Sequence, residues 1–191
     1  MSGSQDGDEI GGRAATGVPE VVARWCAALE RGDVETAVAC VSDDVELSSP
    51  VTEQFRYCGP DQVRALLTSV VRVVRDVEFH TRLGDGRTYG LFYRATVRGQ
   101  LFEEAQLVTL SEDDARISRL TLYGRPVAAV TGLMATVGPG IARGEGRRGL
   151  AAVLTTATVP LHAMHRLGER YLVPLAKPRG AGPGDGASAP G

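Results

Sequence analysis

Between residues 77 and 123, apolar and polar side chains alternate along four runs that are joined only by short turns. A period of two is typical of strands with one buried and one exposed face. The turns fall at residues 84–86, 99–100 and 111–115. Parallel strands need a crossover of about a dozen residues or more, which these turns are too short to provide. The pattern therefore predicts an antiparallel meander with strands at about 77–83, 88–98, 101–110 and 116–123.

The chain before this sheet has a helical pattern. Apolar residues recur at helical spacing from Val18 to Leu29, and Gly32 is a stop signal. A short helix follows from Asp33, then a strand over 45–49, then a third helix after Gly59. Helices followed by a curved antiparallel sheet predict an α+β domain that packs the apolar face of its sheet on the helices. A helix laid across a bent sheet leaves a cavity, where we expect the functional site.

Beyond residue 125 the pattern is helical again, and we expect a break at Gly138-Pro139-Gly140 and another interruption at Pro160. The apolar run between Arg148 and Arg166 is short for a membrane span, which needs about 20 apolar residues. We predict one or two helices that pack on the domain or on a second subunit. An interfacial membrane contact, suggested by the flanking arginines, is disfavoured.

The predicted organisation has four parts: a disordered tail at 1–17, the α+β pocket domain at 18–125, a helical extension at 126–177 and a second disordered tail at 178–191. Both tails are rich in Gly, Ser, Pro and Asp and poor in apolar residues. The N-terminal tail lacks the apolar core of a signal peptide, so we expect a cytoplasmic protein.

Composition disfavours several functions. A formal charge of -2 and a pI near 5.9 provide no basic face for nucleic acid. Cys26, Cys40 and Cys58 form no CxxC pair, and His162 and His165 have no carboxylate triad around them, so we expect no metal site. The sequence lacks a glycine-rich phosphate loop, and no cofactor is predicted.

Three segments resemble a known family. They are ARWCAALERGDVETAVACVSDDVELSSP, CGPDQVRALL and EAQLVTLSEDDARISRLTLY. Together they are similar to the nuclear transport factor 2-like, or SnoaL-like, superfamily, in the branch that includes the ketosteroid isomerases. The resemblance covers about residues 18–125. It implies a cone-shaped α+β fold and a small-molecule pocket, and homodimers are common in the superfamily.

The resemblance also implies roles for three positions, and all three have changed. The base of the isomerases corresponds to Ser49, while their two oxyanion-hole donors correspond to Trp25 and Gln106. A serine hydroxyl cannot remove a proton from carbon without a partner base. The indole N–H and the side-chain amide remain donors. The resemblance thus implies a pocket that keeps its donors and has lost its usual base.

Glu104 is the candidate replacement base. If Gln106 faces the cavity, strand alternation places Glu104 and Val108 on the same face. Burial in an apolar cavity raises the pKa of a carboxyl group, which suits acid or base chemistry. The alternative is a carboxylate at the rim, paired with Arg94 or solvated. His80, the other titratable candidate, is expected to face solvent.

The predicted pocket lining combines apolar side chains with the polar tips of tyrosines, for which Tyr57, Tyr89, Tyr93 and Tyr123 are the candidates. Aromatic residues on strands are also commonly core residues, and this alternative stays open. Besides the residues above, the predicted lining comprises Val51, Tyr57, Leu66, Leu67, Val108 and Tyr123.

Two functions follow from this sequence. The first is a cofactor-independent isomerase or polyketide cyclase that acts on an apolar carbonyl compound, with Glu104, Gln106 and Trp25 as its catalytic groups. The second is a non-catalytic module for ligand binding or dimerisation, which the loss of the acid at Ser49 favours. A third interpretation has the C-terminal segment dock on a partner while the domain serves as a scaffold.

Overall fold

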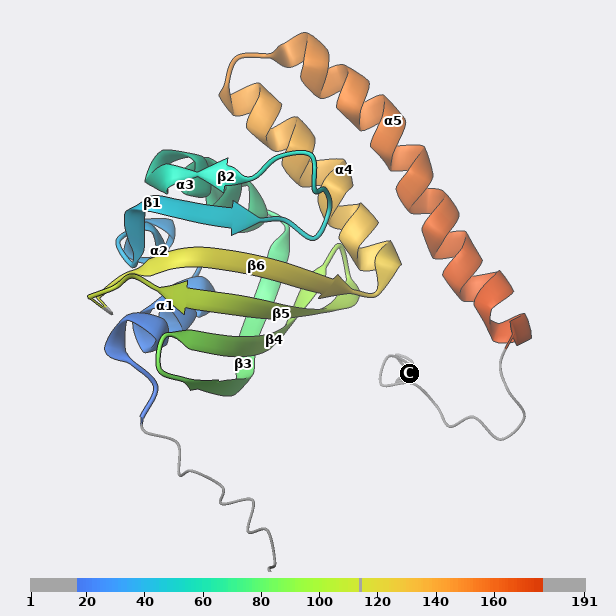
Figure 1. Ribbon diagram of the computed structural model, residues 1–191. Helices are drawn as coiled ribbons and strands as arrows, with labels where there is room; N and C mark the ends of the chain where they lie inside the picture. The colour runs from blue at the N-terminus through green and yellow to red at the C-terminus, as the bar shows by residue number, and fades with distance from the viewer. Residues whose placement is uncertain (1–16, 114, 177–191) are drawn as a thin grey trace, which may run out of the picture.

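The computed structural model describes residues 17–113 and 115–176 (Figure 1). The two predicted tails lie outside these residues, apart from Gly17. The described chain forms N-terminal helices, a six-stranded sheet and a C-terminal pair of long helices. The predicted α+β class is therefore confirmed.

The first helix, α1 (Glu20–Arg31), forms where the helical pattern predicts it. It buries Val22, Trp25, Cys26 and Ala28 on one face. It ends at Gly32, whose φ of 66° places it in the left-handed region that glycine adopts without steric cost. This helix brings the aromatic ring of Trp25 against the sheet.

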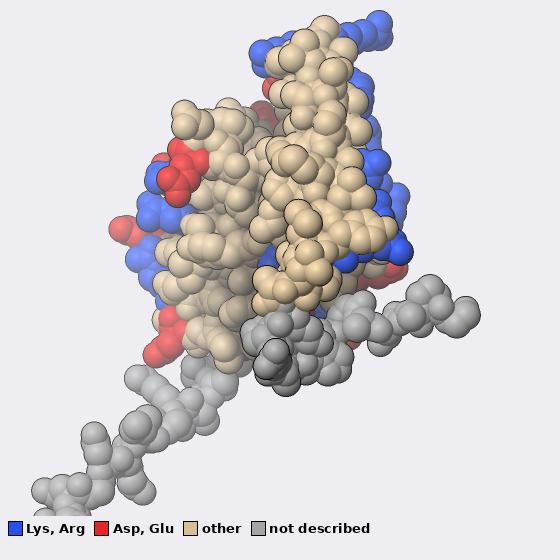
Figure 2. All heavy atoms as spheres, turned by 90° about the vertical axis from the view of Figure 1, so that its right-hand side faces the viewer, with Lys and Arg blue, Asp and Glu red and all other residues tan. Residues whose placement is uncertain are grey.

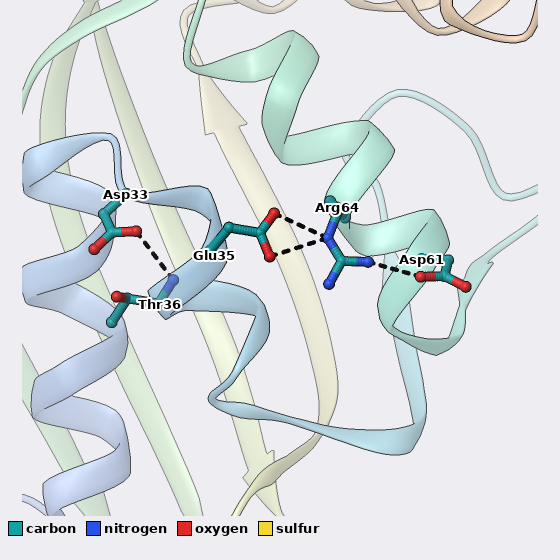
Figure 3. A network of polar contacts seen from close by, with 5 residues as sticks. All are labelled: Asp33, Glu35, Thr36, Asp61 and Arg64. Atoms are coloured by element: carbon teal, nitrogen blue, oxygen red, sulfur yellow. Dashed lines mark hydrogen bonds and ion pairs between the residues drawn. The ribbon is translucent and has the colours of Figure 1, made fainter.

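Side-chain hydrogen bonds and ion pairs position the next helix, α2 (Val34–Val38), shown in Figure 3. The Asp33 carboxylate accepts a hydrogen bond from the Thr36 backbone N–H at 3.0 Å, as an N-cap does. Arg64 on helix α3 (Gly59–Val70) donates to Glu35 at 3.0 Å and to Asp61 at 2.7 Å. These ion pairs are exposed, so they set the register of the two helices more than they stabilise the fold.

The sheet has the strand order β2-β1-β6-β5-β4-β3. The last four strands in sequence pair antiparallel, as the short turns predict. The pairing of β1 with β6 is parallel and was not predicted. The strands are β1 (Val41–Ser48), β2 (Tyr57–Cys58), β3 (Val74–Asp85), β4 (Thr88–Val97), β5 (Gln100–Leu110) and β6 (Ile117–Arg125).

Strand β5 shows which face of the sheet is covered. Its buried side chains are those of Phe102, Glu104, Gln106, Val108 and Leu110, at every second position. Helices α1 and α3 contact the sheet at strands β3 and β1 and share a continuous apolar core with it. The predicted alternation along this strand is therefore correct.

The C-terminal extension differs from the expected pattern. Helix α4 (Val127–Gly144) continues through Gly138-Pro139-Gly140, and helix α5 (Arg148–Leu167) continues through Pro160, so both predicted breaks are wrong. An internal proline removes one helical hydrogen bond, and packing outweighs that loss here. Gly140 lies against Ser69 of α3, where an added Cβ would come within 3.2 Å of the hydroxyl oxygen. A turn of π-helix (Gly168–Leu172) and a 3-10 turn (Val173–Ala176) complete the described chain.

Helices α4 and α5 form a hairpin that lies across one end of the sheet, with α5 outermost (Figure 1). Gly132 of α4 lies against the buried ring of His162, whose Nδ1 is 3.0 Å from the Ala128 carbonyl oxygen. Because that oxygen only accepts, Nδ1 carries the proton. Burial lowers the pKa of His162, which favours the neutral ring at this contact.

We expect Gly132→Ala to weaken the hairpin by on the order of 1 kcal/mol, because the added Cβ would lie 3.0 Å from His162 Cε1. The matched control is Gly149→Ala in α5, where the added Cβ meets nothing within 4 Å. Hydrogen exchange of the α5 amides measures the effect. Equal protection in the two variants would contradict tight packing at Gly132.

Candidate functional site

A cavity of about 1020 Å³ lies between the inner face of the sheet, helices α1 and α3, and the α4–α5 hairpin. Most of its wall is apolar, and it includes Leu47, Leu66, Leu122, Leu133, Val137 and Leu154. Its size falls at the upper end of the range of small-molecule sites, and its apolar wall with a few polar groups is typical of them.

The buried polar groups on its wall form a hydrogen-bonded chain that runs from helix α1 to strand β4. Trp25 Nε1 donates to Gln106 Oε1 at 2.9 Å, and Gln106 Nε2 donates to Glu104 Oε1 at 3.0 Å. Tyr93, directly opposite Glu104 in the β4–β5 pairing, is hydrogen-bonded to the Glu104 carboxyl group. Two elements far apart in sequence are thereby connected through one side-chain amide.

Trp25 determines which way the Gln106 amide points. An indole N–H can only donate, so the atom of Gln106 that faces it must be the oxygen. The NH₂ group is then directed to Glu104, where one of its hydrogens is used and the second remains for another acceptor. The donor predicted at Trp25 is therefore occupied, because its single N–H bonds Gln106.

Glu104 is a buried carboxyl group whose side chain faces the cavity, with the residue only 6% exposed. Burial raises its pKa to about 7, and the hydrogen bonds from Gln106 and Tyr93 limit that rise. Burial, followed by the charge of Glu104, also raises the pKa of Tyr93. Glu104 therefore changes its charge near neutral pH.

The alternative of a rim carboxylate paired with Arg94 fits the neighbouring residue instead. Arg94 Nε donates to Glu103 Oε1 at 3.0 Å, and Arg125 also bonds Glu103. These hydrogen bonds hold the pKa of Glu103 below its usual range. Glu104 is on the opposite face of the strand, inside the domain.

Five of the predicted lining residues border the cavity: Ser49, Val51, Tyr57, Leu66 and Leu67. Ser49 Oγ accepts a hydrogen bond from the Val51 backbone N–H at 3.2 Å, so the hydroxyl stabilises the turn after β1. This hydrogen bond joins Ser49 to the backbone and provides no carboxylate that could act as a base for its hydroxyl group.

Two predicted lining residues lie elsewhere. Val108 is fully buried in the core and does not border the cavity. Tyr123 pairs with Ala105 on the outer face of the sheet and is 57% exposed, because its neighbour Leu122 takes the inward position opposite Gln106. His80 is exposed, as expected. Within residues 17–113 and 115–176, no group of three or more His, Cys, Asp or Glu side chains could hold a metal ion.

Two features of the site were not predicted from the sequence: the contact of Tyr93 with Glu104 and the part of the wall that comes from the hairpin. Tyr93 meets Glu104 only through the register of β4 with β5, and a hairpin turn at 98–100 could have indicated that register. The α4–α5 hairpin contributes Leu133, Val137 and Leu154 to the wall. Their apolar character was visible in the sequence, but no local signal placed them against the cavity.

The fold and this site define a small α+β pocket protein with the cystatin-like, or nuclear transport factor 2-like, architecture. Residues 22–120, just over half of the chain, match the profile of the SnoaL-like domain, and the chain belongs to this family. The predicted superfamily is thus confirmed. The match ends before the α4–α5 hairpin begins.

Solved structures agree on the fold. An uncharacterised bacterial protein with a cystatin-like fold from Silicibacter pomeroyi DSS-3 is 24% identical, with a TM-score of 0.56 over 60% of this chain and 79% of that one. A steroid delta-isomerase from Pseudomonas aeruginosa is 23% identical, with a TM-score of 0.56 over 66% of this chain and 89% of that one. At this identity the likeness shows the fold alone. Comparison with curated proteins finds no match.

We expect Glu104→Gln to remove a pH dependence of stability. The pKa of Glu104 rises from an ordinary value of 4.5 to about 7 on folding, so folding takes up a proton between these pH values. The contribution to the free energy of unfolding is complete below pH 4.5 and is lost as the pH rises through 7, by at most about 3 kcal/mol. Denaturant unfolding from pH 4 to 8 measures the difference between the two proteins.

The matched control is Glu103→Gln, one residue away. The lowered pKa of Glu103 gives a contribution that is present above the ordinary pKa and lost as the pH falls. Glu103→Gln should therefore change only the acid side of the profile. Parallel profiles of the wild type and Glu104→Gln would contradict the raised pKa of Glu104.

We expect Trp25→Phe to raise the pKa of Glu104 further. Without the indole N–H, the amide of Gln106 is free to rotate and present its oxygen to Glu104, which favours the protonated acid. Carbon-13 NMR of labelled glutamate carboxyl groups measures the titration. Tyr57→Phe, which alters another aromatic of the cavity wall, is the control and should leave the Glu104 pKa unchanged.

Proposed function

We propose that this protein binds an apolar carbonyl compound in its cavity and transfers a proton through Glu104, as a cofactor-independent isomerase or cyclase. The single observation that carries the proposal is a buried carboxyl group with a pKa of about 7 on the wall of a large apolar cavity. A general base is most effective when its pKa is near the working pH.

In the proposed step, the Glu104 carboxylate takes a proton from the carbon next to the carbonyl group. The electron pair of the broken C–H bond forms the C=C bond of an enolate, and the carbonyl electrons move to the oxygen. The second N–H of Gln106 would donate to that oxygen. In a ligand that has a C=C bond next to this carbon, the enolate is conjugated with it. The oxygen electrons then re-form the carbonyl group, the C=C bond moves next to the carbonyl, and the far carbon takes the proton back from Glu104, which completes an isomerisation without any other reactant.

This arrangement departs from the ketosteroid isomerase pattern in two ways. The base is supplied by strand β5 in place of the position that Ser49 occupies. The only indole N–H is already bonded to Gln106, so Gln106 carries the donor role that the resemblance divides between two residues. Trp25 then acts as a positioning residue for the amide.

A second candidate function is non-catalytic binding of the same class of ligand. It is favoured by the hydrogen bonds that Glu104 already receives from Gln106 and Tyr93. These bonds hold the carboxyl group in a fixed position and favour a structural role for it. In that case the polar chain would fix the shape of the pocket and orient the carbonyl group.

Hydrogen–deuterium exchange of the acidic α-protons of β-tetralone, an apolar ketone, followed by proton NMR in D₂O, tests the proposed step. We expect the wild type to accelerate exchange, with a rate that rises with pH through about 7 as Glu104 ionises. Glu104→Gln should reduce the enzymatic rate by roughly 100-fold or more. Glu103→Gln, on the outer face, should retain the wild-type rate.

Quenching of Trp25, the only tryptophan of the chain, reports ligand binding in the same samples. Equal quenching in wild type and Glu104→Gln, with exchange no faster than in buffer, would support the binding function. Exchange that persists in Glu104→Gln would remove Glu104 from the mechanism. Absence of both signals would count against this ketone class as the ligand.

A further inference from the structure

The outward face of helix α5 is uncharged along nearly its whole length. No Asp, Glu, Lys or Arg occurs between Arg148 and Arg166. Figure 2, which views the hairpin side of the molecule, shows a continuous uncharged surface there. Its large exposed apolar side chains are Val153, Val159, Met164 and Leu167, followed beyond α5 by Tyr171, Leu172, Val173 and Leu175. An apolar surface of this extent marks an interaction site.

The threonine hydroxyl groups of α5 are hydrogen-bonded within the helix. Thr155, Thr156 and Thr158 each donate to the backbone carbonyl four residues earlier, at 2.8, 3.0 and 2.7 Å. A threonine bonded in this way uses its hydroxyl hydrogen within its own helix. The face therefore offers few free donors to water, even where its residues are nominally polar.

Arginines stand at both ends of this apolar face. Arg143, Arg147 and Arg148 are exposed at its start, and Arg166 and Arg170 at its end. Residues 141–176 contain five Arg and two Glu, a net charge of +3, whereas residues 17–140 contain 13 Arg and 17 Asp or Glu, a net charge of -4. The positive charge is thus concentrated on the hairpin of an otherwise acidic domain.

We propose that helix α5 and the turns that follow it lie flat on an anionic lipid membrane, with the apolar face inserted and the arginines at the headgroups. An exposed apolar helix surface buries itself at the boundary between lipid headgroups and acyl chains, and arginines at its ends add attraction to anionic lipids. Among the described residues, no helix is long and apolar enough to cross a membrane. Contact along the membrane surface is the arrangement that suits both the length and the charge pattern.

A second copy of the chain fits this face less well. Two α5 helices packed antiparallel would bring the Arg148 end beside Arg166 and Arg170, and a parallel pair would place each cluster beside its own equivalent. Like charges meet in either case, which costs free energy. An anionic headgroup layer supplies the opposite charge at both ends of the helix.

Co-sedimentation of the full chain with two kinds of vesicle tests the proposal: phosphatidylcholine alone, and phosphatidylcholine mixed equally with phosphatidylglycerol. We expect binding to the anionic vesicles that weakens as salt is added. The double variant Val153→Glu, Met164→Glu should lower the affinity at least tenfold. The double variant Arg148→Gln, Arg166→Gln should lower it by roughly tenfold or more.

The matched controls make the same kinds of substitution on the surface of the α+β domain, away from the hairpin. Leu83→Glu alters an exposed apolar residue of strand β3, and Arg24→Gln with Arg72→Gln removes two exposed arginines of the domain. Both should bind like the wild type. Far-UV circular dichroism checks that each variant is folded. If Val153→Glu, Met164→Glu does not fold, Arg148→Gln, Arg166→Gln still tests the proposal.

Several results would overturn the proposal. They are the absence of vesicle binding, equal binding to neutral and anionic vesicles, and equal losses in the hairpin and control variants. A concentration-dependent dimer that Val153→Glu, Met164→Glu abolishes, without vesicle binding, would assign the face to a second copy. None of these results depends on the activity of Glu104, so the outcome is independent of the proposed function.

Discussion

The hydrogen bond from Trp25 to Gln106 is the contact on which the site depends. It joins helix α1 to strand β5 across the core at 2.9 Å, and its direction is fixed because an indole N–H cannot accept. It orients the amide of Gln106, which then donates to Glu104. Without it, the buried carboxyl group would face an amide that could turn either way. One donor on a helix thereby sets the electrostatics of a carboxyl group on a strand.

The contrast between Glu103 and Glu104 shows how strongly the alternation of side chains along a strand affects the pKa of a carboxyl group. The two residues are adjacent and chemically identical, yet alternation places one outside and the other inside. Arg94 and Arg125 bond Glu103 and lower its pKa, while burial raises the pKa of Glu104 to about 7. A shift of one residue in register would exchange these properties. The buried glutamate is tolerated because Gln106 and Tyr93 satisfy it.

Local patterns in the sequence predicted the meander, the first helix and the shared face of Glu104 and Gln106, because these depend on periodicities of a few residues. Contacts between distant segments were not predictable in this way. The parallel pairing of β1 with β6 and the passage of α4 through Pro139 depend on tertiary packing.

The predicted position of Tyr123 on the pocket lining differs from the structure for a related reason. The β5–β6 register shifts between Thr109 and Leu110, so Ile117 and Leu120 are both buried at a spacing of three and the simple alternation fails.

Helix α5 is apolar on two sides, and these sides have different surroundings. Its inner side packs on α4, where His162 meets Gly132, and Leu150 and Leu154 border the cavity. Its outer side carries Val153 and Met164, more than 60% exposed, on a helix with no charged residue between its ends. Exposure of these apolar side chains to water is unfavourable, and the packing of the inner side on α4 does not remove this cost. The hairpin lies beyond the segment that matches the family, and it both forms part of the cavity wall and presents this second surface. A lipid surface on the outer side would place the cavity wall one helix away from the layer in which apolar molecules dissolve.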